Sequence, residues 1–483
     1  MLQIRCFGLR KLVDLLAGVM LLGFAASVSA DPKPLTKEEQ AKVDKAIERG
    51  IRFLKRAQRP SGAFPREVTG ISSKHFPFVV GQTVLPALAL LECGVAPDDP
   101  CVQKTALLLR KHASKLESTY ELSLVLMFLD RLGERQDEET IRSLALRLVA
   151  GQCYTGGWSY RCPHLTTEQE ADLLKALRAL QKNLGAVRPA PREGAKQGEA
   201  KAAPEVPASL AKLAVFQNPS NLFVREEVAS SRVDRPVFFA GGTDNSNTQF
   251  ATLALWAARR HDLPLIPTFR LIVRRFECSQ SADGTWSYAY RFGGAIRQTL
   301  PATNTGAGLL GLAIGCAEIP TEKNEQTRRE KQIVYGLAVL SGVIGDPTEL
   351  LVLRKYEEPN YYLLWTIERV AALYKLQEVG RQDWYRWGAA VLLTNQRANG
   401  EWPRVHTGVD VTHSGSFSSS LNTTFALLFL KRSNLTKDLT AKLPLKPEEL
   451  NKGIMALSNG SALKNASSSN SSSTKQRSAT SPP

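Results

Sequence analysis

Three polar side chains near the C-terminal part of the chain have types and spacing that could support chemistry. His406, Asp410 and His413 form the pattern His-x3-Asp-x2-His. Two imidazoles and a carboxylate are a partial ligand set for zinc, and an aspartate that orients a histidine is also a common acid–base pair. Gly408 and Gly415 indicate a loop rather than one helix face. We therefore predict no metal and leave the cofactor unknown, while keeping the three side chains as catalytic candidates.

Further polar and aromatic residues stand where apolar segments begin. Asp244 is a fourth catalytic candidate, and the ligand-binding candidates of this kind are Tyr120, Glu121, Asn247, Asn304, Tyr361 and Tyr362. Aromatic and amide side chains that converge on a cavity could hold a sugar or a prenyl chain. The same residues could instead cap helices and fill the core. The sequence leaves both interpretations open.

Basic residues follow four similar turns along the chain. They are Arg66, Arg161, Arg291 and Arg404, and we predict that they bind an anionic ligand together. Arginine binds phosphate, sulfate or carboxylate through two parallel hydrogen bonds. The alternative is that they are scattered solvated charges of a basic protein.

The elements that must position these residues come from an internal repeat. Four times the chain reads Gln, three residues, Gly, one residue, aromatic, in Gln58-Gly62-Phe64, Gln152-Gly156-Trp158, Gln280-Gly284-Trp286 and Gln396-Gly400-Trp402. Each copy follows a segment whose apolar residues recur at intervals of three and four, as in an amphipathic helix. We expect the glycine to be the left-handed residue that ends the helix, and the aromatic ring to fold over the glutamine.

Segments of a second kind alternate with these helices. They are apolar on most faces, which is typical of buried helices, and most open with Ser, Thr or Asn, which favour the N-cap. The alternation gives six hairpins of one outer and one inner helix. Because such hairpins cannot bury their inner faces alone, we predict an all-α fold, an α6/α6 toroid over residues 31–450.

The repeat resembles that of squalene cyclases and protein prenyltransferases, in which a glutamine precedes Gly-x-Trp or Gly-x-Phe. The resemblance covers roughly residues 40–432 and implies the terpenoid cyclase superfamily and its α/α toroid. The acid string Asp-x-Asp-Asp of squalene-type cyclases does not occur in this sequence. For the zinc ligands of the prenyltransferases, the nearest matches are Asp244 and His413, but no cysteine stands two residues after Asp244.

The residues outside the predicted ring fall into three segments. The N-terminal one indicates export, and the other two are predicted to be irregular. Residues 1–30 combine basic residues, a twelve-residue apolar run and small residues before Ala30, which predicts a cleaved signal peptide, with a retained membrane anchor as the alternative. An insertion is expected at about 160–240, flexible over 185–210, and a disordered Ser/Asn-rich tail over 451–483. Six cysteines remain after cleavage, and Cys93/Cys101 and Cys153/Cys162 could each form a local disulfide.

The charge limits the partners. The formal net charge of the whole chain is +16, which favours an anionic or isoprenoid-like small molecule or a polysaccharide, allows contact with a membrane surface, and in an exported protein argues against nucleic acid. We expect a toroid that binds such a ligand in its central cavity. The alternative is a divergent enzyme acting there, either cyclase-like or prenyltransferase-like, or a polysaccharide lyase or glycosidase. The oligomeric state is left open.

Overall fold

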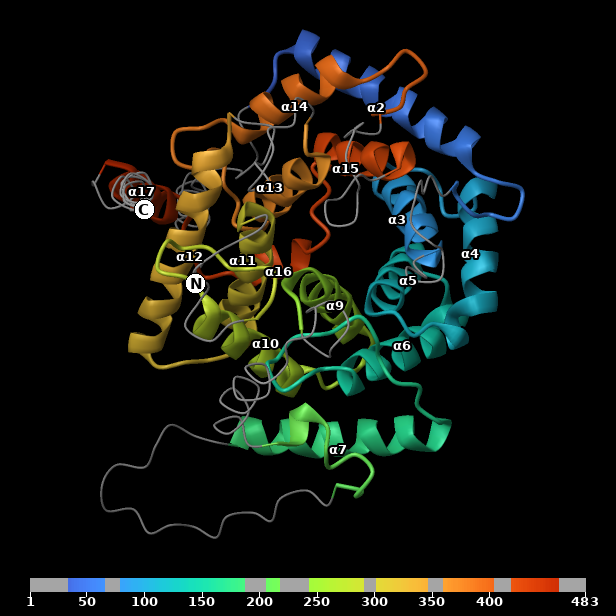
Figure 1. Cartoon of the computed structure of the whole chain (residues 1–483), viewed down its shortest axis with the longest axis vertical. Helices are drawn as coiled ribbons and strands as arrows, with labels where there is room; N and C mark the ends of the chain where they lie inside the picture. Colours follow the sequence, from blue (N-terminus) through green and yellow to red (C-terminus); the bar gives the residue numbers. More distant parts are fainter. Residues whose placement is uncertain are drawn as a thin grey trace, which may run out of the picture.

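The computed structural model describes residues 34–65, 79–186, 206–217, 243–290, 301–345, 359–403 and 418–459. Within these residues the chain is helical, and two concentric layers of helices form a ring (Figure 1). The inner layer consists of α3 (Val79–Glu92), α5 (Thr119–Leu132), α9 (Asn245–Ala258), α11 (Pro301–Glu318), α13 (Tyr361–Leu373) and α15 (Ser419–Lys431). The outer layer consists of α2 (Lys37–Ala57), α4 (Pro100–His112), α6 (Glu138–Ala150), α10 (Ile266–Ser279), α12 (Lys323–Val343) and α14 (Trp384–Asn395).

The inner layer is a closed ring. Each inner helix packs against the next one along the chain, and the last, α15, packs against the first, α3. The inner helices are buried on nearly all faces, as their sequence segments predicted. Outer helices such as α2 bury one side, whereas α6 is buried on all faces from Leu144 to Ala150. The prediction of an α/α toroid built from six hairpins is therefore confirmed.

The repeated glutamines join neighbouring outer helices. Each side-chain Nε2 donates to the carbonyl of the repeat glycine four residues later, at 3.0–3.2 Å. Each also donates to a carbonyl of the following outer helix: Gln58 to Cys101 O of α4 (2.8 Å), Gln152 to Thr268 O of α10 (3.2 Å), Gln280 to Gln332 O of α12 (2.9 Å) and Gln396 to Ala46 O of α2 (2.9 Å). The last of these bonds joins the final outer helix to the first.

The repeat glycines lie in the turns after the outer helices. Gly62, Gly156, Gly284 and Gly400 have φ between 74° and 94°, which favours glycine. The helices α2, α10 and α14 end five residues earlier, and their C-cap residue is in each case the repeat glutamine, which has extended backbone. The expectation that the glycine itself ends the helix is therefore wrong, because the glutamine takes the C-cap position and the glycine forms the turn that its side chain binds.

The repeat tryptophans enter the space between the two layers. Trp158, Trp286 and Trp402 are fully buried. Each indole Nε1 donates to an outer-helix carbonyl ten residues earlier, at 2.7–2.9 Å. Each tryptophan backbone N–H also donates to a threonine hydroxyl of the next inner helix: to Thr248 and Thr423 at 3.1 Å and to Thr305 at 3.4 Å. Each repeat tryptophan thus forms hydrogen bonds with both helix layers, which explains why it recurs six residues after the repeat glutamine.

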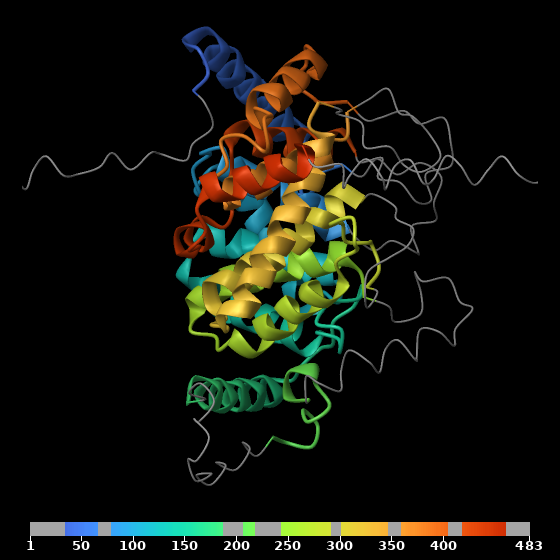
Figure 2. The same ribbon diagram turned by 90° about the vertical axis from the view of Figure 1, so that its left-hand side faces the viewer.

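Three further helices lie outside the two layers. The helix α7 (Thr167–Ala186) crosses the outside of the ring, in contact with α6 and α10 (Figures 1 and 2). The short helix α16 (Lys437–Lys442) contacts α11 and α13, and its Asp438 accepts from Trp256 Nε1 at 2.8 Å. It therefore lies at the end of the ring where the inner helices terminate. The helix α17 (Pro447–Asn459) packs on α12.

The structure describes only part of the segments that were predicted to lie outside the ring. The helix α17 continues to Asn459 and buries Leu450 and Ile454, so it includes the first residues of the predicted tail. Residues 206–217, at the end of the segment expected to be flexible, pack on α10 through η3 (Ala214–Phe216). The predicted signal peptide, residues 187–205 and residues 460–483 lie outside the described part. None of the six cysteines after the predicted signal peptide forms a disulfide within the described ranges, so neither local disulfide is formed. Within the described residues, no helix combines the length and the apolar character needed to cross a membrane.

Candidate functional site

The segments that lead into the inner helices meet at one end of the ring. Isolated backbone bridges pair Ser118 with Arg161, and Asp244 with both Trp158 and Ala289. Thr119 N also donates to Tyr160 O at 3.0 Å, and Asn245 N to Tyr288 O at 2.7 Å. We call this end, formed by residues 117–119, 158–162, 243–245 and 287–290, the mouth. These segments lie at the same end of the ring because in every hairpin the outer helix is followed by an inner helix.

Asp244 lies at the centre of the mouth and is buried. Its Oδ1 accepts from Asn247 N and its Oδ2 from Asn247 Nδ2, both at 2.7 Å, so the carboxylate caps α9. Burial raises the pKa of Asp244 to about 6, against the lowering effect of the Asn247 hydrogen bonds and the Arg275 charge. A carboxyl group with this pKa exchanges a proton near neutral pH, but both of its oxygens already have a structural role.

Arg275 is a fully buried cation behind Asp244. Its Nε donates to Asn245 Oδ1 at 2.9 Å, and one terminal nitrogen donates to the hydroxyls of Thr155 (3.0 Å) and Thr243 (2.9 Å). The guanidinium carbon lies 4.9 Å from the centre of the Tyr290 ring. Arg275 therefore fixes the segments before α9 and after α6, and it supplies positive potential to the mouth.

Tyrosine hydroxyls provide neutral polar groups beside Asp244. Tyr120 OH donates to Ser246 Oγ at 2.6 Å, and the hydroxyls of Tyr160 and Tyr288 share a hydrogen bond of 2.6 Å. Burial raises the pKa of Tyr160 to about 12, with a further contribution from the Asp244 charge. These phenols stay protonated at physiological pH, so the polar groups beside Asp244 are uncharged hydroxyls.

Below the mouth, aromatic side chains from four inner helices meet across the ring interior. We call Tyr120, Phe250, Tyr362, Trp365 and Phe425 the aromatic belt. Ring centres are 5.3 Å apart for Tyr120–Phe250, 6.2 Å for Phe250–Trp365, 5.2 Å for Trp365–Phe425 and 5.4 Å for Tyr362–Phe425. The helices α9 and α13 are not neighbours in the ring, so the contact between Phe250 and Trp365 crosses its interior.

A polar strap crosses the interior beside the belt. Gln249 Nε2 of α9 donates to Tyr362 OH of α13, and Arg369 donates to Gln249 Oε1 at 3.0 Å. The Arg369 guanidinium carbon also lies 4.0 Å from the centre of the Trp365 ring. This distance is that of a cation–π interaction, so the Arg369 charge is held against an aromatic ring within a largely apolar interior.

Glu368 is the most unusual ionisable group of the described residues. It is fully buried on α13, three residues after Trp365, and neither carboxyl oxygen has a hydrogen-bond partner among those residues. Burial raises the pKa of Glu368 well above its usual value, more than the nearby Arg369 charge lowers it. The side chain is therefore a neutral carboxylic acid, because an unpaired charge would be very costly at such a position.

The structure brings only some of the predicted site residues together. Asp244, Asn247, Tyr120 and Tyr362 lie in or next to the mouth, with Asp244 and Asn247 acting as a helix cap. Glu121, Asn304 and Tyr361 are buried on α5, α11 and α13. Arg161 is at the mouth, but its side chain is 77% exposed and forms an ion pair with Glu117 at 3.1 Å. The other predicted residues, Arg66, Arg291, Arg404, His406, Asp410 and His413, lie outside the described residues, so the arginine cluster and the histidine pair stay predictions.

Sequence analysis missed the most perturbed groups. Arg275 and Glu368 are single charged residues within helical segments. A charged residue in such a segment is expected on the solvent-facing side of the helix. Phe250, Trp365 and Phe425 lie in segments that the sequence predicts to be buried apolar helices, which gives them no role beyond the core. For Trp365 and Glu368, the sequence contained one indication of burial, namely that both residues lie in a segment predicted to be a buried inner helix.

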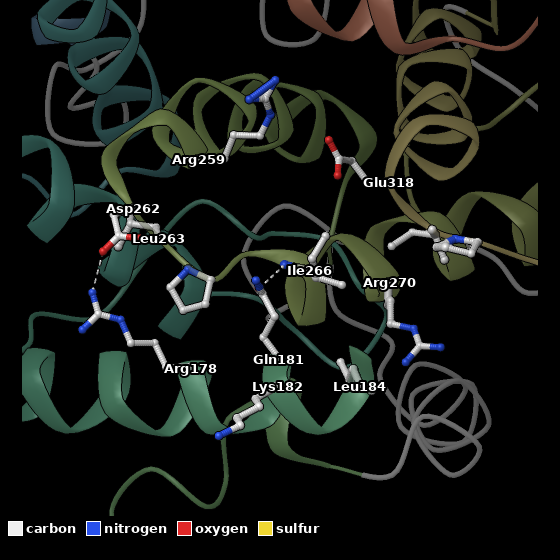
Figure 3. Close-up of a pocket in the computed structure, with 13 residues that line it drawn as sticks. Arg178, Gln181, Lys182, Leu184, Arg259, Asp262, Leu263, Ile266, Arg270 and Glu318 are labelled. Carbon is white, nitrogen blue, oxygen red and sulfur yellow. Dashed lines mark hydrogen bonds and ion pairs between the residues drawn. The ribbon is translucent and has the colours of Figure 1, made fainter. Parts of the chain in front are cut away.

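A cleft of about 800 Å³ lies far from the mouth, between α7 and the connections that follow α9 and α11 (Figure 3). Arg178, Gln181 and Leu184 of α7 line one side of it, and Arg259, Leu263 and Ile266 line the other. No group of three His, Cys, Asp or Glu side chains suited to a metal ion occurs within the described ranges.

The closed double ring defines the chain as an α/α toroid. No family model matches the sequence, and no curated protein matches it. Solved structures of the type II terpene cyclase MstE from Scytonema are similar. One, with its substrate geranylgeranyl dihydroxybenzoate, is 12% identical and covers 82% of this chain and 99% of its own, with a TM-score of 0.44. Another, with the product merosterolic acid A, is 13% identical and covers 84% and 99%, with a TM-score of 0.43.

Proposed function

We propose that this chain is an exported α/α toroid that binds an isoprenoid-like ligand in the interior of its ring, against the aromatic belt. The observation that carries the proposal is the meeting of aromatic rings from α5, α9, α13 and α15 just below a mouth rich in hydroxyl groups. Binding sites for such ligands are mostly apolar with a few placed polar groups. The aromatic belt supplies apolar ring surface of the kind that suits branched, unsaturated carbon chains, while the hydroxyl groups of the mouth suit a polar end.

Export is supported by the N-terminal sequence alone. The basic residues, the short apolar run and the small residues before Ala30 have the order of a secretory signal. Expression of the full chain in a bacterium, followed by N-terminal sequencing of the periplasmic fraction, tests this. A chain that starts at Asp31 supports export, and a chain recovered only with its leader in the membrane fraction supports an anchor.

Replacement of the central belt residue should weaken ligand binding. We expect Trp365→Ala to weaken the binding of farnesol by about tenfold or more, because losing a buried aromatic surface of this size removes about 1.5–3 kcal/mol. Trp365→Phe should restore most of the affinity. Isothermal titration calorimetry with farnesol and farnesyl diphosphate measures both variants.

The matched control is Tyr335→Ala, which removes an aromatic ring on the outer helix α12 that is 44% exposed. It should leave the affinity unchanged. If Trp365→Ala bound farnesol as tightly as the parent while remaining folded, the interior site would be ruled out. A gain in affinity for farnesyl diphosphate over farnesol would add support for the predicted arginine cluster.

A divergent enzyme that acts in the same interior is the second candidate, and Glu368 favours it. A neutral carboxylic acid can donate its proton to an alkene: the O–H bond breaks and its electron pair stays on the carboxylate, the alkene electron pair forms a C–H bond, and positive charge develops on the neighbouring carbon. Loss of conversion of an isoprenoid probe in Glu368→Gln, with farnesol binding retained, would support catalysis. Retained conversion would exclude Glu368 as the acid.

Glu368→Gln also has an expected effect on stability that does not depend on a substrate. Because the folded state holds the Glu368 proton more tightly than the unfolded state, the parent loses stability as the pH rises above the usual glutamate pKa. The amide variant has no such loss. We expect its melting temperature to exceed that of the parent by several degrees at pH 8 and to approach it near pH 4. Equal differences at both pH values would contradict the neutral state of Glu368.

A further inference from the structure

The cleft between α7 and the ring is a preformed feature, separate from the mouth. Arg178 pairs with Asp262 at 2.8 Å, and Gln181 Oε1 accepts from Ile266 N at 3.2 Å, so both sides of the cleft are linked (Figure 3). Leu173 and Leu177 of α7 are fully buried. The cleft lies where α9 ends and the mouth where it begins, a separation of about 20 Å for a helix of this length.

The cleft has an apolar floor. Leu263 and Pro264 are buried at its base, and Leu184, Ile266 and Ile319 add partly exposed carbon surface. Its volume of about 800 Å³ falls in the range of sites for small ligands, which combine an apolar lining with a few polar groups. A hydrocarbon body could therefore be received there.

The charges that line the cleft are unbalanced. Four cations, Arg178, Lys182, Arg259 and Arg270, stand against two carboxylates, Asp262 and Glu318. Both carboxylates already bind a cation, since Asp262 pairs with Arg178 and Glu318 with Lys442 (2.5 Å).

The remaining cations differ in their partners. Arg259 is paired with Asp438 at 2.5 Å. Lys182 and Arg270 are exposed and have no carboxylate partner among the described residues. Arg270 projects from α10 beside Leu184 (Figure 3), so a cation that can form two parallel hydrogen bonds stands next to the apolar floor.

We propose that this cleft binds an amphiphile with a single anionic head group, which Arg270 binds while the hydrocarbon part lies on Leu184, Leu263 and Ile266. Lys182 adds to the attraction without direct contact being required. This site does not depend on the central ligand.

The proposal can be tested with dodecyl phosphate below its micelle concentration, by isothermal titration calorimetry on the mature chain. Inorganic phosphate and dodecyl maltoside provide the head group alone and a neutral amphiphile. We expect saturable binding of dodecyl phosphate only, weakened about tenfold or more by Arg270→Gln, a few fold by Lys182→Gln, and also by added salt.

Two variants control the assignment. Arg52→Gln removes an exposed arginine of α2 and should leave the affinity unchanged. Trp365→Ala should also leave it unchanged, which separates this cleft from the central site. An unchanged affinity in Arg270→Gln, or an equal loss in Arg52→Gln, would overturn the proposal. If inorganic phosphate bound as tightly as dodecyl phosphate, the apolar floor would have no role in binding and the proposal of an amphiphile would be overturned.

Discussion

Trp286→Ala is expected to lower the free energy of unfolding by about 3–5 kcal/mol. Trp286 is fully buried between the two helix layers. Glycines face it on both sides: a Cβ atom at Gly308 would lie 2.3 Å from the indole ring, and one at Gly336 3.0 Å from it. Because these neighbours have no side chains that could move into the space, the cavity left by the substitution should persist.

Urea unfolding monitored by circular dichroism measures the effect. Trp286→Phe should give an intermediate loss, since it keeps much of the buried ring but leaves Phe276 O without the indole N–H donor. Leu107→Ala, at a side chain that is 65% exposed, should change the stability by less than about 0.5 kcal/mol. A Trp286→Ala variant within that same margin of the parent would refute the structural role of the repeat.

Gly156→Ala is the second substitution with a large expected effect. Gly156 has φ = 74°, and a Cβ atom there would lie 2.1 Å from Leu271 O of α10. The left-handed backbone costs a residue with a side chain about 1–2 kcal/mol, and overpacking against a fixed carbonyl adds about 1–3 kcal/mol. We therefore expect a total loss of about 2–5 kcal/mol, measured by the same urea titration.

Gly133→Ala separates the two contributions. Gly133 has nearly the same φ, 78°, but nothing lies within 4 Å of its hypothetical Cβ. It should show only the backbone cost of about 1–2 kcal/mol. If the two variants were equally destabilised, the close approach of the turn to α10 would contribute nothing.

The fold could be predicted from the sequence because its determinants are local and repeated. Gln280, Gly284 and Trp286 lie within seven residues of one another, and their shared spacing with three other copies identifies the turn without tertiary information. The alternation of amphipathic and apolar helices then leaves a closed ring as the way to bury the inner faces. Even the partners of the glutamines, on the next outer helices, follow once the ring is assumed.

The candidate site was less predictable, because its properties depend on helices that are distant in sequence. Asp244 was chosen for its carboxylate, yet its main contacts are with Asn247, three residues away. Phe250 and Trp365 come into contact only because α9 and α13 face each other across the ring. Glu368 looks like an ordinary surface glutamate in the sequence, and its neutral state arises from burial without a partner.

The bond from Gln396 to Ala46 has a consequence for how the molecule loses its structure. In an open array of repeats, the two end units have a neighbour on one side only, so unfolding can begin there and proceed inward. Here α14 is bound to α2 and α15 packs on α3, so every unit has neighbours on both sides. The circle has no free edge, and opening any one hairpin breaks two interfaces at once. Such a molecule tends to melt as a whole.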